Sequence, residues 1–184
     1  RDMSAEGVRF LPPAVNLAGV RTGIASDADG QAVVLGLSEV KHVGKAADGI
    51  VEAREEGGPF TSLADFKRRT GAGARVVKSL IEAGAFDRFG PRLGLMALLP
   101  VAESDLAVPE IEWGALERDF RQRQVLGISL GTHPTKLLGR QIRDWINGRP
   151  IDAPEQVPEA DGARVAVVGL VSDAYEKATR YGPM

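Results

Sequence analysis

The residues best suited to binding a ligand lie in a short segment, LSEVKHVGKAADGIVEAR, which runs from Leu37 to Arg54. Gly44 permits a tight turn there and a close approach of the backbone to a ligand. The backbone N–H groups of Gly44, Lys45 and Ala46 come at the start of a helix, where they lack helical partners and can face one anion. Lys41 and Lys45 add positive charge. The pattern indicates a phosphate site whose contacts do not read bases.

The same pattern also fits a helical hairpin that binds nothing. A glycine at such a turn is common in proteins that have no ligand there, and the motif alone supports both interpretations equally. His42 and Val43 complete the turn, and an exposed place is more usual for such a histidine than a catalytic one. The basic run from Lys67 to Arg69 is typical of a solvated helix end.

Several elements must position this turn. The β-branched stretch QAVVLGL, from Gln31 to Leu37, predicts a short strand. Ser38 can begin a helical turn that ends at Lys41. Ser62, with Asp65 three residues later, has the spacing of a helix N-cap. Apolar periodicity and glycine stops predict helices over Lys45–Glu56, Ser62–Arg69 and Arg75–Ala83.

Further elements are expected in the second half of the chain. A short helix over Pro91–Leu99 precedes an acidic connector. A charged helix is expected over Ile111–Leu126, with Trp113, Leu116, Phe120 and Gln124 at helical spacing. Beyond it the sequence predicts a helical stretch from His133 towards Trp145, a break at Asn147–Pro150, a buried strand over Arg164–Val171 and a second strand that begins near Tyr175.

Composition limits the classes of function. The 184 residues contain no cysteine and only two histidines, His42 and His133, so disulfides, zinc–thiolate sites and histidine metal sites are not expected. The sequence has neither an apolar run long enough to span a membrane nor a signal-peptide pattern, and we expect a cytoplasmic protein without membrane contact. A net charge of −2 means that any contact with nucleic acid must be local.

Five separated segments resemble bacterial C-family DNA polymerase III alpha subunits, in order and in spacing. They are VRFLPPAVN, GLSEVKHVGKAADGIVEAREEGGPFTSLADFKRR, VVKSLIEAGAFDRFG, VLGISLGTHP and RVAVVGLV. The resemblance covers nearly the whole chain and corresponds to the region that follows the catalytic palm. We expect both ends of the chain, at Arg1 and Met184, to be cuts in a longer protein.

The resemblance implies a mainly α fold with a small β part, in which a helix-hairpin-helix domain is followed by the incomplete start of an OB-fold. It implies that residues 1–36 are the end of the fingers, 37–149 the helix-hairpin-helix (little-finger, clamp-binding) domain, 150–162 a linker and 163–184 the truncated OB start. The expected DNA phosphate site comprises Lys41, His42, Val43, Gly44, Lys45 and Ala46. No catalytic or metal-binding residue is expected, because the palm lies upstream.

Two features depart from the family pattern. The family's hairpin often has a glycine where this chain has His42. The connector from Leu99 to Ile111 lacks the glutamine-led apolar and aromatic pentapeptide with which replicative members bind the sliding clamp. The second departure puts clamp binding through this region in doubt. It also makes a specialised or error-prone paralogue an alternative to a replicative subunit as the full-length protein.

The sequence thus predicts a part of a DNA-directed DNA polymerase that holds double-stranded primer–template DNA by its phosphate backbone. No cofactor is expected in this chain, whereas the full polymerase would use magnesium. The sliding clamp and other holoenzyme subunits are partners expected of the full protein. Two alternatives remain: a stand-alone helix-hairpin-helix protein of DNA repair or recombination, and a scaffold that binds only protein partners.

Overall fold

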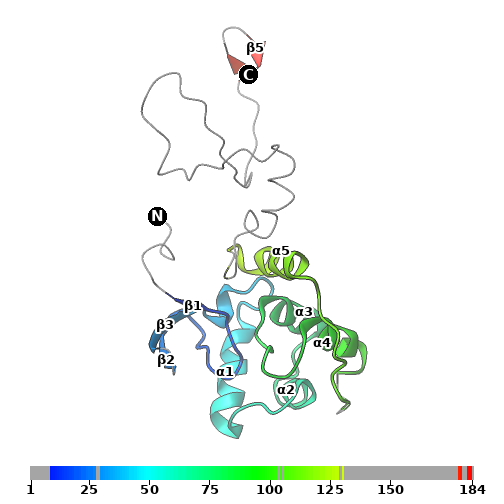
Figure 1. Cartoon of the computed structure of the whole chain (residues 1–184). Helices are drawn as coiled ribbons and strands as arrows, with labels where there is room; N and C mark the ends of the chain where they lie inside the picture. The colour runs from blue at the N-terminus through cyan, green and yellow to red at the C-terminus, as the bar shows by residue number, and fades with distance from the viewer. Residues whose placement is uncertain are drawn as a thin grey trace. The chain divides into compact units, whose positions relative to one another are not determined.

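The computed structural model describes residues 9–27, 30–102, 104, 106–128, 130, 178–179 and 182–183. The chain divides into two compact units, Arg1–Gly131 and Thr132–Met184. The first unit contains a small sheet and a group of helices, which Figure 1 shows in order along the chain.

The sheet of the first unit has three short strands in the order β1-β3-β2. Strand β1 (Phe10–Leu11) runs parallel to β3 (Gly30–Val34), and β2 (Gly23–Asp27) runs antiparallel to it. Strand β3 confirms the strand expected from the β-branched run, although it begins one residue earlier and ends before Leu35.

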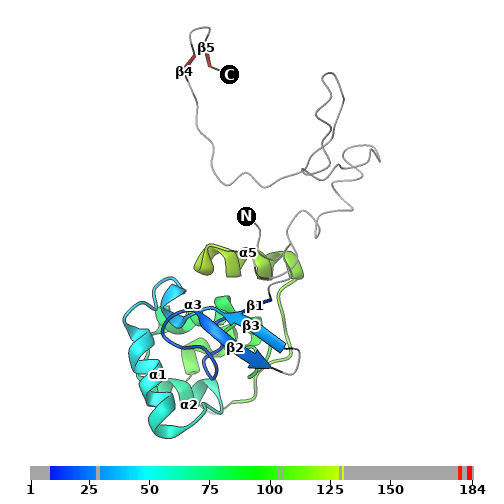
Figure 2. The same cartoon turned by 90° about the vertical axis from the view of Figure 1, so that its left-hand side faces the viewer.

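The first unit has many more residues in helices than in strands, which confirms the mainly α fold with a small β part. Figures 1 and 2 show the sheet lying against the helical group. The helices are the 3-10 turn η2 (Leu37–Glu39), α1 (Ala46–Gly57), α2 (Leu63–Thr70), α3 (Ala74–Ala83), α4 (Arg92–Leu98), the 3-10 turn η3 (Leu99–Val101) and α5 (Ala115–Leu126).

Capping residues set the ends of α2 and α3 as the sequence predicts. The Ser62 hydroxyl accepts a hydrogen bond from the Asp65 N–H at 3.1 Å, and the Asp65 carboxylate accepts one from the Thr61 N–H at 3.1 Å. Gly71 and Gly84 end α2 and α3 in the left-handed conformation, which glycine adopts without steric cost.

One hydrophobic core joins the sheet to the helices. Phe66 lies at its centre, with ring centroids 5.0 Å from Phe60 and 4.8 Å from Phe86, both in edge-to-face geometry. Val15 and Val34 belong to the same buried cluster, so residues from before and after position 36 share one core. The expected division at 36/37 and the other domain boundaries stay predictions.

Two arginines connect the C-terminal end of α1 to the rest of the unit. The Arg54 guanidinium donates to the carbonyls of Val15 and Ala18 at 2.8 and 2.7 Å. The Arg69 guanidinium of α2 donates to Gly58 O at 2.7 Å and lies 4.4 Å from the Phe60 ring centroid. Arg69 is therefore a packing residue, and the expectation that the whole basic run is a solvated helix end is wrong for it.

Helix α5 corrects the expected pattern in its start and in its buried face. It begins at Ala115, so Trp113 precedes it. Leu116 and Phe120 are 43% and 56% exposed. The buried residues are Asp119, Gln122 and Val125 instead.

Hydrogen bonds explain why α5 buries a polar side chain, Gln122, and leaves Leu116 and Phe120 exposed. The Gln122 amide donates to Ala83 O at the end of α3 at 2.8 Å, and Arg121 pairs with Glu82 at 3.2 Å. A polar side chain can be buried when its hydrogen-bonding groups find partners in this way.

The second unit has few described residues. Strands β4 (Ala178–Thr179) and β5 (Gly182–Pro183) pair antiparallel. The helical stretch expected after His133, the linker at 150–162, the strand over Arg164–Val171 and the strand near Tyr175 lie outside the described residues. Among the helices that the structure describes, none is long and apolar enough to cross a membrane.

Candidate nucleic-acid interface

The predicted phosphate site is a tight turn between η2 and α1. The N–H of Val43 donates to Val40 O at 3.0 Å, and the N–H of Ala46 donates to Val43 O at 2.9 Å. His42 and Gly44 have positive φ angles of 71° and 43°. The two left-handed residues bend the chain sharply into the first turn of α1.

The turn is fixed from inside and from one side. Val40 and Val43 are 1% and 3% exposed and belong to the main core. The N–H of Lys41 donates to the carbonyl of Val125 at 2.8 Å, so the end of α5 holds the turn in place. A turn held in this way presents its outer surface with little loss of conformational freedom on binding.

The structure separates the six predicted residues into two groups. Val43 is buried, and the N–H of Ala46 is already bonded to Val43 O. The remaining residues of the set are exposed: Lys41, His42, Gly44 and Lys45. Among the described hydrogen bonds, the N–H groups of Gly44 and Lys45 have no protein acceptor. These two groups are the donors left for an anion.

The structure adds Arg75, which the sequence pattern did not place at this turn. Arg75 is exposed in the first turn of α3, and its Nη2 lies 3.4 Å from Nε2 of His42. Desolvation and the positive charges of Arg75 and Lys41 lower the pKa of His42 below its ordinary value of 6.5. In the sequence, Arg75 is only a basic residue that follows the glycine-rich turn between α2 and α3. This position does not indicate how far Arg75 lies from His42.

Several other cations of the helical group are held by protein acceptors. Arg69 and Arg68 pair with Asp65 at 3.1 and 3.0 Å, and Arg92 pairs with Asp87 at 2.7 Å. Arg121 pairs with Glu82 and with Glu117. Ion pairs of this kind reduce the charge that these arginines offer to a phosphate.

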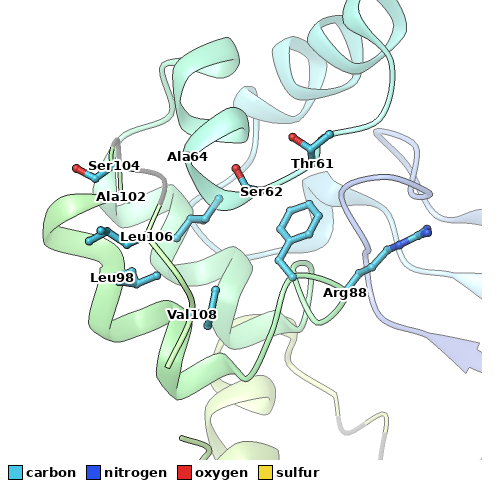
Figure 3. Close-up of a pocket in the computed structure, with 11 residues that line it drawn as sticks. Thr61, Ser62, Ala64, Arg88, Leu98, Ala102, Ser104, Leu106 and Val108 are labelled. Carbon is cyan, nitrogen blue, oxygen red and sulfur yellow. The ribbon is translucent and has the colours of Figure 1, made fainter. Parts of the chain in front are cut away.

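A separate cavity of about 210 Å³ lies between the start of α2 and the α4–η3 region. Figure 3 shows Leu98, Leu106 and Val108 on one side of it and Thr61 and Ser62 on another. None of the hairpin residues lines it. In the part of the chain that the structure describes, no group of three or more His, Cys, Asp or Glu residues could hold a metal ion.

Comparison with known proteins assigns the turn to a known structural motif. A family model described as a helix-hairpin-helix motif matches residues 7–93, which include η2, the turn, α1, α2 and α3. The chain is 31% identical to DNA polymerase III subunit alpha of Thermus aquaticus, over 100% of the chain and 17% of that protein. The resemblance to the alpha-subunit family is confirmed.

Other alpha subunits agree with this match. The chain is 27% identical to the Escherichia coli K12 subunit over 96% of its length and 18% of the subunit. The chain is also 30% identical to the Deinococcus radiodurans subunit, over 86% of the chain and 13% of the subunit. The chain thus spans less than a fifth of the length of these alpha subunits, and the activity of a whole subunit is a matter for proposal.

Proposed function

We propose that this chain is a DNA-binding part of a DNA polymerase III alpha subunit, which holds duplex primer–template by its phosphate backbone during template-directed synthesis. The observation that carries the proposal is the pair of N–H groups at Gly44 and Lys45, which have no acceptor among the residues that the structure describes. They lie on a fixed turn, beside the exposed side chains of Lys41 and Lys45, in a chain similar to alpha subunits.

The chemistry of the turn favours phosphate over bases. Two adjacent N–H donors and nearby ammonium groups complement one phosphodiester oxygen pair. Backbone donors and lysine charges do not distinguish one base from another. A chain with net charge −2 has no general attraction for DNA, so binding through this turn is weak and depends on salt.

The remaining functions belong to the full polymerase. Magnesium-dependent nucleotidyl transfer and binding to other holoenzyme subunits are proposed for the parent and not for this chain. We expect clamp binding through the connector Leu99–Ile111 to be weak or absent. Leu106 is 55% exposed there, but Val108 is half-buried and packs against the core.

Fluorescence anisotropy of the 184-residue chain with labelled duplexes tests the proposal. Two duplexes of unrelated sequence should bind alike at low salt. Replacing Lys41 and Lys45 together by Ala should weaken binding to both duplexes equally and flatten the plot of log affinity against log salt by about one to two units. The matched control replaces Arg88 and Arg118, two exposed arginines outside the turn, and should change the slope less.

Two results would contradict the proposal. If folded K41A/K45A protein keeps the affinity and salt slope of the unmodified chain, the turn is structural only. If the unmodified chain has no affinity for duplex at low salt but binds a protein partner at nanomolar concentration, the scaffold alternative explains the turn better. Circular dichroism of each variant establishes that it is folded.

A further inference from the structure

Arg75 differs from most arginines of the helical group in the partner that it contacts. Arg54, Arg69, Arg92 and Arg121 donate to carbonyls or carboxylates. Arg75 contacts the imidazole of His42, and it forms no ion pair with any carboxylate that the structure describes. Its positive charge is therefore not neutralised by its contact.

The chemistry of this contact defines the state of His42. A guanidinium group has donors and no acceptor, and it stays protonated in proteins. Nε2 of His42 must therefore accept, so the neutral imidazole carries its proton on Nδ1. The imidazole can orient the guanidinium without cancelling its charge. The left-handed conformation of His42 is the conformation in which this contact is made.

We propose that Arg75 is a second phosphate-binding side chain of the hairpin site and that His42 positions it. This inference rests on the proposed function and extends it from one phosphate to two. The first phosphodiester would lie at the N–H groups of Gly44 and Lys45, and a neighbouring phosphodiester would lie at Arg75. The planar guanidinium can donate two hydrogen bonds to one phosphate, and together these groups grip a stretch of backbone.

Single replacements of Arg75 and His42 test the two parts of the proposal by the same anisotropy assay. Arg75→Ala should weaken duplex binding about tenfold and flatten the salt slope by about one unit, because a charged phosphate contact is lost. The matched control is Arg88→Ala, since Arg88 is also an exposed arginine but follows the opposite end of α3. Alanine has a high helix propensity, so Arg75→Ala should leave α3 folded.

His42→Gly removes the imidazole and keeps a residue that tolerates a φ of 71°. It should weaken binding by less than Arg75→Ala and leave the salt slope unchanged, since a neutral ring is lost. The double variant should bind like Arg75→Ala alone, because a positioning residue has no effect without the side chain that it positions.

The possible outcomes separate this inference from the proposed function. If Arg75→Ala behaves like Arg88→Ala while K41A/K45A weakens binding, the second phosphate contact is wrong and the first stands. If His42→Gly reduces binding equally with or without Arg75, the positioning role is wrong. If the unmodified 184-residue chain does not bind duplex, both proposals fail.

Discussion

Positive φ angles at two turn residues, His42 and Gly44 on either side of Val43, give the hairpin its shape. The sequence predicts this for Gly44, because a glycine before a helix is typical of such turns. It does not predict the φ of 71° at His42, since a left-handed conformation costs a non-glycine residue about 1–2 kcal/mol. Only the glycine that the family often has at this position hinted at the conformation.

Replacing Gly44 by Ala tests the conformational requirement of the turn. An added Cβ would meet no atom within 4 Å, so the cost comes from the φ of 43° alone. We expect a loss of about 1 kcal/mol in the free energy of unfolding by denaturant. Gly49 is the control, because its added Cβ also meets nothing within 4 Å but it lies inside α1. Gly49→Ala should stabilise the chain by about 1 kcal/mol. Equal effects of the two changes would show that Gly44 does not need its left-handed conformation.

The electrostatic link between His42 and Arg75 can be measured by NMR. Besides desolvation, the charges of Arg75 and Lys41 lower the pKa of His42. Arg75→Ala should therefore raise the pKa of His42 towards 6.5, whereas Arg88→Ala should leave it unchanged. The chain has only two histidines, so a His133 variant assigns their signals. A pKa of His42 that does not rise in Arg75→Ala would show that the two side chains do not lie together in solution.

At the scale of elements, local patterns predicted α2 and α3 well because local rules decide the limits of these two helices. Ser62 and the left-handed glycines Gly71 and Gly84 act within one turn of their helix. Helix α5 was predicted with the wrong buried face because its contacts are distant in sequence. Gln122 reaches Ala83 O, a carbonyl 39 residues away, and periodicity contains no information on such a partner.

A second distant contact caps α4 and is testable by pH. The Glu112 carboxylate accepts the N–H groups of Arg92 and Leu93 at 3.0 and 3.3 Å, while Pro91 offers no side-chain cap. Desolvation alone would raise the pKa of Glu112, but the N–H groups of Arg92, Trp113 and Leu93 and the charge of Arg118 together lower it.

Glu112→Gln should therefore lower the stability at pH 7 by about 1 kcal/mol. The folded state binds the proton of Glu112 less readily than the unfolded state does. Its stabilisation is thus present above the ordinary pKa of 4.5 and is lost as the pH falls through the lowered folded value. Denaturant unfolding of both proteins between pH 7 and pH 3 should show the difference shrinking. A difference that does not change with pH would contradict the cap.

At the scale of the whole molecule, the chain matches one part of a family of much longer proteins. The resemblance puts the catalytic palm outside that part, so the purified chain should not extend a primer when supplied with magnesium and nucleotides. A complete DNA polymerase on the same primer–template is the positive control. Template-dependent extension by this chain above a buffer control would overturn the expected boundary.

The candidate site shows how far sequence alone could reach in this molecule. The exposed lysines and Gly44 were found because they are adjacent in sequence. Arg75 was missed because it is 33 residues from His42. The support of the turn by Val125 O was missed as well, because a backbone carbonyl has no sequence signature. The fold brings together what local patterns list separately.

The central claim is that the N–H groups of Gly44 and Lys45 hold a DNA phosphate. Titration of the isotope-labelled chain with a short duplex, followed through backbone amide signals, tests it most directly. The largest shifts should occur at Gly44 and Lys45, and they should be the same for two unrelated duplex sequences. Unmoved signals at both residues, with the largest shifts elsewhere in the chain, would contradict the account.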